Sequence, residues 1–225
     1  MARKIFYFVR HGESILNQKG IRQGSEGALS DKGRLQAEQT GQRFKGRTID
    51  IILVSPYERT KETAAIINKY VNKNIEYCDL LKERRNPSEI VGKLADSEEV
   101  TKIVDIIDRS FHADDYRYSD EENFLDLKNR AKALLDYLAL RKEKNILVVT
   151  HGIFLKMVGA YLVEGEALTA SAYNKLSFLN SSSNASITVC EYKTGWYIPS
   201  KDKGWKLIAW DDYAIGAKEL KSKPI

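Results

Sequence analysis

Two histidines of this 225-residue chain stand in the same local setting, because each is directly followed by a glycine. His11 lies between Arg10 and Gly12, and His151 precedes Gly152. An imidazole exchanges protons near neutral pH, and its unprotonated nitrogen can attack an electrophilic atom. A glycine beside it lets the backbone approach a bound molecule closely. Both histidines are therefore candidates for one catalytic site.

Groups that bind anions accompany the two histidines. Arg10 precedes His11, Asn17 follows it by six positions, and Arg59 lies shortly after Ser55-Pro56. A guanidinium presents a planar fork of donors that matches two phosphate oxygens, and an amide adds a further donor. Taken singly, each of these residues is more often an ordinary surface residue or a polar residue at the end of a strand. Together they favour a site for a dense anion such as phosphate.

Three apolar, β-branched segments precede these residues and predict buried strands. They are Ile5–Val9, Ile49–Val54 and Asn145–Thr150. The first ends at Arg10 and the third delivers His151. In open α/β sheets, ligands bind outside the carboxyl ends of the strands. The predicted strands therefore bring the two histidines to one sheet edge.

Apolar residues at helical spacing follow each of these strands. Helices are expected from a Ser30 cap to about Phe44, from Glu58 to Tyr70 and from Ile153 to Leu162. Two further strands are expected at Ser186–Tyr192 and Trp205–Trp210. Strands that alternate with helices predict an α/β fold, a three-layer α/β/α sandwich with a mostly parallel central sheet. Gly152 would open the last helix, whose first amides could hold an anion.

The whole chain, residues 1–225, is interpreted as a single domain. The charged segment at about 84–123 fits the strand–helix alternation poorly, and we interpret it as an insertion or lid beside the site. His112 lies within it and is expected to be a surface residue. Residues 165–183 form a second irregular region.

Composition limits the classes of function. The net charge is +5 and the pI is about 9.0, but no dense basic tract favours nucleic-acid binding. Two distant cysteines and three histidines show no zinc spacing, so no metal is expected. No apolar stretch is long enough to span a bilayer, and the short N-terminal apolar run is not a signal peptide. We therefore expect a cytoplasmic protein without a membrane or nucleic-acid partner.

The motifs resemble those of a known family. Arg10-His11-Gly12-Glu13-Ser14 with Asn17 resembles the signature of the histidine phosphatase superfamily, which includes cofactor-dependent phosphoglycerate mutase. Three further motifs match in order along nearly the whole chain: Leu29–Ala37, Val54–Ala64 and Val148–Gly152. The resemblance implies a phosphoglycerate mutase-like fold.

The resemblance also implies roles for individual residues. His11 would be the nucleophile that becomes phosphorylated. Groups that would bind the phosphoryl oxygens are Arg10, Arg59, His151 and Gly152, assisted by Asn17 and Gln23. Glu83, in Leu81-Lys82-Glu83, matches the position of the family's general acid.

Some rim segments depart from the family pattern. Residues 86–89 read Asn-Pro-Ser-Glu where relatives often carry a Gly- and Trp-containing stretch, and Ile215 stands near the position of a histidine in many members. These changes lie outside the expected phosphate pocket, so they put the substrate in doubt and leave the phosphotransfer chemistry intact.

Three functions remain open. The first is a histidine acid phosphatase-type phosphomonoesterase, which hydrolyses a phosphorylated small molecule through phosphohistidine at His11 without metal or other cofactor. The loop at 18–28 resembles the phosphatase branch of the family and favours this function. The second is phosphoglycerate mutase-type transfer, and the third is a catalytically silent phosphate-binding or interaction module. A homodimer would be common for the family, although no segment marks an interface.

Overall fold

A six-stranded sheet forms the centre of the molecule. The structure is a computed structural model that describes residues 2–110, 113, 115–176, 182–196 and 199–213. The strand order is β3-β2-β4-β1-β5-β6. The bounds are Ala2–Arg10 for β1, Ile51–Val54 for β2, Ile75–Tyr77 for β3, Asn145–Thr150 for β4, Ile187–Thr194 for β5 and Gly204–Asp212 for β6.

The four strands on one side of the sheet run parallel, as the sequence predicted. β1 pairs with β4, β4 with β2 and β2 with β3 in parallel, whereas β5 pairs antiparallel with both β1 and β6. In the β1–β4 register, Arg10 lies opposite Thr150, and the His11 amide donates to the Thr150 carbonyl at 3.0 Å. This register places His11 and His151 side by side, just beyond the ends of two neighbouring strands.

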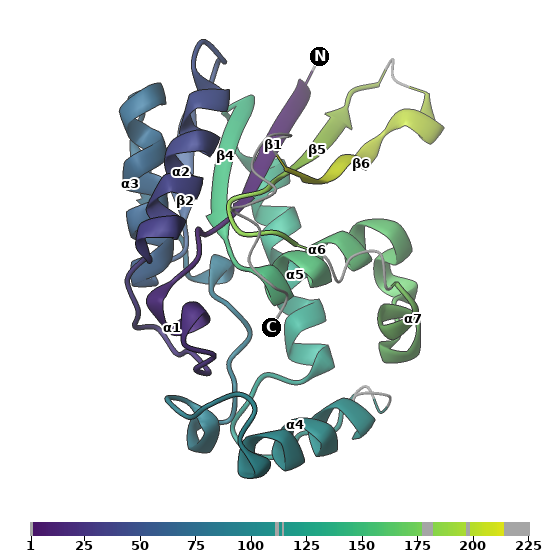
Figure 1. Cartoon of the computed structure of the whole chain (residues 1–225). Coiled ribbons are helices and arrows are strands. Elements are labelled where there is room, and N and C mark those ends of the chain that lie inside the picture. The colour runs from purple at the N-terminus through teal and green to yellow at the C-terminus, as the bar shows by residue number, and fades with distance from the viewer. Residues whose placement is uncertain (1, 111–112, 114, 177–181, 197–198, 214–225) are drawn as a thin grey trace.

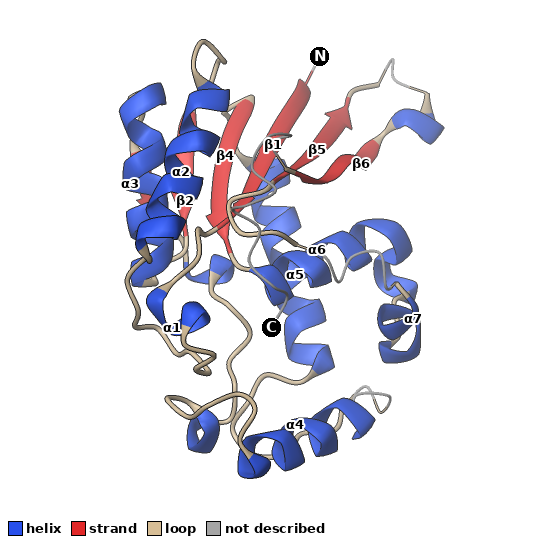
Figure 2. Cartoon of the chain, in the orientation of Figure 1, coloured by secondary structure: helices blue, strands red, loops and turns tan. Residues whose placement is uncertain are grey.

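Helices cover both faces of the sheet and complete a three-layer α/β/α sandwich (Figures 1 and 2). Helices α2 (Asp31–Phe44) and α3 (Glu58–Val71) lie on one face, and α5 (Phe124–Leu140) and α6 (Gly152–Glu164) on the other. The buried side chains divide into two main clusters, one on each face. The fold expected from the sequence is therefore confirmed.

Local sequence explains where the helices begin. The Ser30 side chain accepts the Gly33 amide and caps α2, and Gly152 opens α6, as expected. Helix α5 was not expected; its capping box joins Asn123 and Asp126, each side chain accepting the other's amide. The short edge strand β3 was also not expected, because three partly exposed residues give no pattern.

The segment at 84–123 contains helix α4 (Glu98–Ser110) and packs against the loop that follows the short helix α1 (Ile15–Gln18). The Ala95 amide donates to the Gly20 carbonyl at 2.7 Å, and the Gly92 amide donates to the Arg22 carbonyl at 2.9 Å. Figure 1 shows α4 beyond the carboxyl ends of β1 and β4, on the histidine side of the sheet. A lid function of this segment stays a prediction.

A further short helix, α7 (Ala170–Lys175), lies after α6. No helix in the described part of the chain is long and apolar enough to cross a membrane. His112 and Ile215, singled out from the sequence, lie outside the described residues.

Candidate active site

His11 is held with one ring nitrogen fixed and the other facing a cation. The side chain is 3% exposed, and its Nδ1 lies 2.7 Å from the Gly12 carbonyl oxygen. A carbonyl can only accept, so we assign the proton to Nδ1 and a lone pair to Nε2. Arg59 Nε donates to this Nε2 at 3.3 Å. The unprotonated nitrogen therefore faces the Arg59 guanidinium.

The surroundings of His11 keep its imidazole neutral. Burial lowers the pKa of His11 well below its usual 6.5, and the charges of Arg59 and Arg10 lower it further. The hydrogen bond to the Gly12 carbonyl acts in the opposite direction and does not reverse the shift. A neutral imidazole at pH 7 is the form that a nucleophile requires.

His151 lies beside His11, as the strand ends predicted. The two ring centroids are 5.2 Å apart, and His151 is fully buried. Its Nε2 lies 2.8 Å from the Ser55 hydroxyl at the end of β2, while its buried Nδ1 has no partner among the described residues. Burial, then Arg59 and His11, lower the pKa of His151 well below 6.5. Side chains that follow three neighbouring strands thus meet at one point.

Arg59 extends from the first turn of α3 into the site, as predicted. It is 2% exposed, and its Nη1 donates to the Gly24 carbonyl at 2.9 Å. Its guanidinium carbon lies 5.0 Å from the centre of the Tyr57 ring. Burial lowers the pKa of Arg59 to about 10, so the side chain stays charged at pH 7.

Arg10 supplies a second, partly buried guanidinium at the end of β1. Its Nη1 donates to the Ser182 carbonyl, while its buried Nε has no partner among the described residues. The side chain passes against Gly152, where an added Cβ would lie 3.2 Å from Arg10 Nε. Gly152 thus makes room for the guanidinium, and the unpaired donor suits an anionic ligand.

Asn17 and Gln23 are joined through Ser14. The Asn17 Oδ1 accepts the Ser14 amide at 3.3 Å, and the Ser14 hydroxyl lies 2.7 Å from Gln23 Oε1. Because these contacts engage the side-chain oxygens, they orient the two NH₂ groups as the donors left for a ligand. This arrangement agrees with the phosphate-binding role expected of both residues.

Glu83 contacts the beginning of α6. Its carboxylate accepts the Phe154 amide at 2.9 Å and the Ile153 amide at 3.3 Å. Its charge raises the pKa of Arg10 and Arg59, against the larger effect of burial on each. The Glu83 charge therefore acts on both arginines, and its carboxylate occupies the amides that the sequence suggested for an external anion.

Sequence reasoning assigned no role to three residues that support the site. The buried Glu13 carboxylate accepts the Ser30 hydroxyl at 3.0 Å and so ties the His11 loop to the start of α2. Asn184 Nδ2 donates to the His11 carbonyl at 3.0 Å. Arg130 of α5 donates to the Lys82 carbonyl at 2.6 Å, directly before Glu83. Only Glu13 lies in a recognised motif; the other two contacts depend on packing between distant segments.

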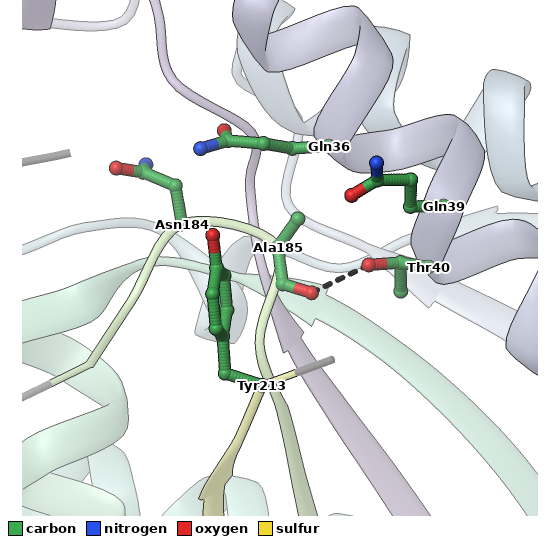
Figure 3. Close-up of a pocket in the computed structure, with 6 residues that line it drawn as sticks. All are labelled: Gln36, Gln39, Thr40, Asn184, Ala185 and Tyr213. Atoms are coloured by element: carbon green, nitrogen blue, oxygen red, sulfur yellow. Dashed lines mark hydrogen bonds between the residues drawn. The ribbon is translucent and has the colours of Figure 1, made fainter. Parts of the chain in front are cut away.

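A small hollow lies behind the His11 loop (Figure 3). Asn184 links it to His11, and Thr40 of α2 donates to the Ala185 carbonyl at 2.6 Å. The six lining residues are Gln36, Gln39, Thr40, Asn184, Ala185 and Tyr213. We interpret these contacts as support for the back of the loop.

The fold and the site together define a class of protein: an α/β/α sandwich with two neutral histidines and two arginines at the carboxyl edge of its sheet. The sequence model of the histidine phosphatase superfamily (branch 1) matches residues 6–199. The chain therefore belongs to this superfamily, as its motifs predicted.

Similar proteins carry two kinds of name. A probable phosphatase of Schizosaccharomyces pombe is 29% identical over 197 residues, which cover 84% of this chain and 88% of the relative. A probable phosphoglycerate mutase (GpmB) of Proteus mirabilis is 31% identical over 208 residues, 88% of each chain. Among solved structures, mycobacterial hydrolase 2 has a TM-score of 0.79 at 18% identity, with 98% of this chain and 95% of that chain covered. That structural likeness shows the fold alone.

Proposed function

We propose that the protein hydrolyses phosphomonoesters through a phosphohistidine formed on His11, without a metal ion. The orientation of His11 carries this proposal. Its imidazole is neutral, and its Nε2 faces Arg59 at 3.3 Å. Among the described residues, no cluster of three or more His, Cys, Asp or Glu side chains is placed to hold a metal ion. The arginines would supply the positive charge in the pocket.

In the first step, His11 Nε2 attacks phosphorus and the bond from phosphorus to the alcohol oxygen breaks. Arg10, Arg59 and His151 would stabilise charge on the three non-bridging oxygens, with donors already in place before the reaction. Asn17 and Gln23 would add amide donors. The Nδ1 proton stays on His11 and is donated to the Gly12 carbonyl in a hydrogen bond, which fixes the tautomer.

In the second step, water attacks the phosphohistidine and releases inorganic phosphate. Glu83, in its protonated form, would donate a proton to the leaving alcohol in the first step and take one from the water in the second. The effect of the Glu83 charge on both arginines supports its position beside the pocket. The acid and base role requires a movement of the carboxyl group, because its oxygens accept the Ile153 and Phe154 amides in this structure.

Transfer to a sugar acid in place of water is the second candidate, because several similar proteins are named probable phosphoglycerate mutases. We favour hydrolysis because the loop at 18–28 resembles the phosphatase branch and other relatives are named phosphatases. Release of phosphate without a bisphosphate primer would distinguish hydrolysis from transfer. A phosphorylated small molecule as substrate and a cytoplasmic location stay predictions.

The direct test is hydrolysis of p-nitrophenyl phosphate in excess EDTA. Wild-type protein is expected to release phosphate, and His11→Ala is expected to lose activity by about a thousandfold or more. Lys45→Gln, at the end of α2 opposite to the Ser30 end that contacts the His11 loop, is the control and should retain activity. Equal activity of wild type and His11→Ala would refute histidine catalysis, and loss of wild-type activity in EDTA would refute metal independence.

A further inference from the structure

The His151 ring has one nitrogen in a hydrogen bond and one without a partner. Its Nε2 lies 2.8 Å from the Ser55 hydroxyl oxygen, whereas its buried Nδ1 has no partner among the described residues. Burial, then the charge of Arg59, lower the pKa of His151 well below 6.5, so the ring carries a single proton at pH 7. The position of this proton decides whether Nδ1 presents a donor or a lone pair.

The sheet places Ser55 beside His151. The Ser55 amide donates to the Val149 carbonyl at 3.0 Å, which extends the pairing of β2 with β4 by one residue. The Ser55 carbonyl accepts the Thr60 hydroxyl at 2.8 Å, from the first turn of α3. Backbone contacts on both sides therefore hold the fully buried Ser55 next to the residue that follows β4.

The two neutral tautomers of His151 differ in the number of buried groups that they leave unpaired. A proton on Nε2 would be donated to the Ser55 oxygen; the Ser55 hydroxyl proton would then have no acceptor within the described structure, and Nδ1 would keep an unpaired lone pair. With the proton on Nδ1, the Ser55 hydroxyl donates to Nε2 and only the Nδ1–H group is unpaired. Because each unpaired buried polar group costs free energy, the second tautomer is favoured.

A second unpaired donor accompanies His151 Nδ1 at the start of α6. Arg10 Nε is also buried without a partner in the described residues, and it lies 3.2 Å from the position of a Cβ added to Gly152, the residue after His151. The Nε of a guanidinium always carries a proton. Two N–H groups beside the same glycine suit one anionic oxygen ligand, whereas a lone pair on Nδ1 would repel it.

Aromatic neighbours hold the plane of the His151 ring. The ring centroid lies 5.2 Å from that of His11 and 5.1 Å from that of Tyr57, at interplanar angles of 63° and 64°. Such edge-to-face contacts restrict rotation of the imidazole. Nε2 is therefore kept on Ser55, and Nδ1 is the nitrogen that is left for a ligand.

We propose that Ser55 is a positioning residue that donates its hydroxyl proton to His151 Nε2 and so keeps the His151 proton on Nδ1, where it binds a non-bridging phosphoryl oxygen. The inference rests on the proposed function and deepens it, because it names the atom through which His151 binds and the side chain that sets its tautomer. Without the Ser55 hydroxyl, the proton could move to Nε2 and a lone pair would face the anion.

The tautomer itself is the first test. Long-range ¹H–¹⁵N correlation spectra at pH 7 distinguish a protonated from an unprotonated ring nitrogen, and His151→Gln assigns the signals. Wild-type His151 is expected to have a protonated Nδ1 and an unprotonated Nε2. In Ser55→Ala, the form protonated on Nε2 is expected to appear, because that is the form a free imidazole side chain prefers.

Thr60→Val is the matched control. It also removes a buried hydroxyl, but one that donates to the Ser55 and Tyr57 carbonyls instead of to His151. The His151 tautomer should therefore be the same in Thr60→Val as in the wild type. Ser55→Cys serves as a second variant, since it nearly preserves the size of the side chain and replaces the hydroxyl with a weak donor.

Inorganic phosphate connects the tautomer to the site. It is expected to shift the Nδ1 signal of wild-type His151 and to leave this nitrogen protonated. Its Kd should rise by about tenfold or more in Ser55→Ala, because a donor to the anion is lost. The kcat/KM for p-nitrophenyl phosphate should fall by a similar factor of about ten in Ser55→Ala and by less in Ser55→Cys.

Each outcome decides the role of Ser55. A proton on Nε2 of wild-type His151 would overturn the inference, whether or not the variants fold, and hydrolysis by that protein would leave the phosphatase function standing. A proton that stays on Nδ1 in Ser55→Ala, or an unchanged phosphate Kd, would show that Ser55 does not set the tautomer that binds phosphate. If the wild type hydrolyses nothing, the proposed function fails; the tautomer and the phosphate Kd need no turnover and still test Ser55.

Discussion

At the scale of single residues, the site depends on two histidines that stay neutral among cations. Burial makes the largest contribution for both, and Arg59 lowers both pKa values further. A protonated imidazole has no lone pair on Nε2 and cannot attack phosphorus. The low pKa of His11 therefore keeps the proposed nucleophile available at and below neutral pH.

The first prediction concerns the titration of these imidazoles. In ¹⁵N-edited NMR spectra recorded from pH 8 to pH 5, His11 and His151 are expected to remain neutral through pH 6.5 and to protonate only well below it. The reason is that burial and the arginines disfavour the charged form. The variants His11→Gln and His151→Gln assign the signals, since each removes one. A midpoint at or above pH 6.5 for His11 would contradict the account.

At the scale of elements, the His11 loop packs directly onto the start of α2. A Cβ added to Gly33 would lie 1.9 Å from the Glu13 carbonyl oxygen, and one added to Gly12 would lie 2.4 Å from the Gly33 carbonyl oxygen. These contacts are to backbone atoms, which cannot rotate away. The two glycines therefore allow the start of α2 to fix the loop that carries His11.

Gly33→Ala is accordingly predicted to destabilise the fold by about 3 kcal/mol and to reduce activity in the protein that remains folded, because the His11 loop must move. Urea unfolding and phosphatase assays on the same samples would measure both effects. Leu35→Ala is the matched control, since Leu35 is 49% exposed on the same helix and its loss should change stability by less than about 0.5 kcal/mol. Equal stability of the two variants would show that the close contact is unimportant.

Helix α5 positions the segment that carries Glu83. Arg130 donates to the Leu80 and Lys82 carbonyls at 3.1 and 2.6 Å and to Glu122 Oε2 at 2.8 Å. Its guanidinium carbon also lies 4.0 Å from the centre of the Phe154 ring, next to the amide that Glu83 accepts. Arg130 is thus a positioning residue for Glu83.

For Arg130→Met, the prediction depends on the leaving group. Activity toward an alkyl phosphate should fall by about tenfold or more, since the alkoxide needs a proton, whereas activity toward p-nitrophenyl phosphate should fall much less. Lys132→Met, on the same helix but paired with the exposed Glu166, should leave both activities unchanged. A parallel loss with both substrates would indicate a structural role only.

At the scale of the whole molecule, parallel strand order explains why motifs far apart in the sequence meet. His11 and His151 directly follow the adjacent strands β1 and β4. Ser55 directly follows β2, shortly before Arg59. Apolar strands that end in polar residues made this arrangement predictable from the sequence, because buried parallel strands share one carboxyl edge. The fold class and the convergence of the site could be predicted for the same reason.

Features that depend on packing between elements could not be predicted. Asn184 reaches the His11 carbonyl from a loop that has no motif, and Arg130 acts through backbone carbonyls of a distant segment. The hydrogen bonds from the first amides of α6 to Glu83 also could not be predicted from the sequence, because a charged segment does not indicate where its side chains point.

The most direct test of the central claim is detection of the phosphorylated nucleophile. Wild-type protein would be mixed with p-nitrophenyl phosphate in excess EDTA, quenched in alkali within the first turnover and analysed by peptide mass spectrometry. Alkaline conditions preserve phosphohistidine, and His11→Ala serves as the control. The account predicts one phosphoryl group on the peptide that contains His11 and none in the variant. Turnover without a phosphorylated His11, or a phosphoryl group on another residue, would contradict it.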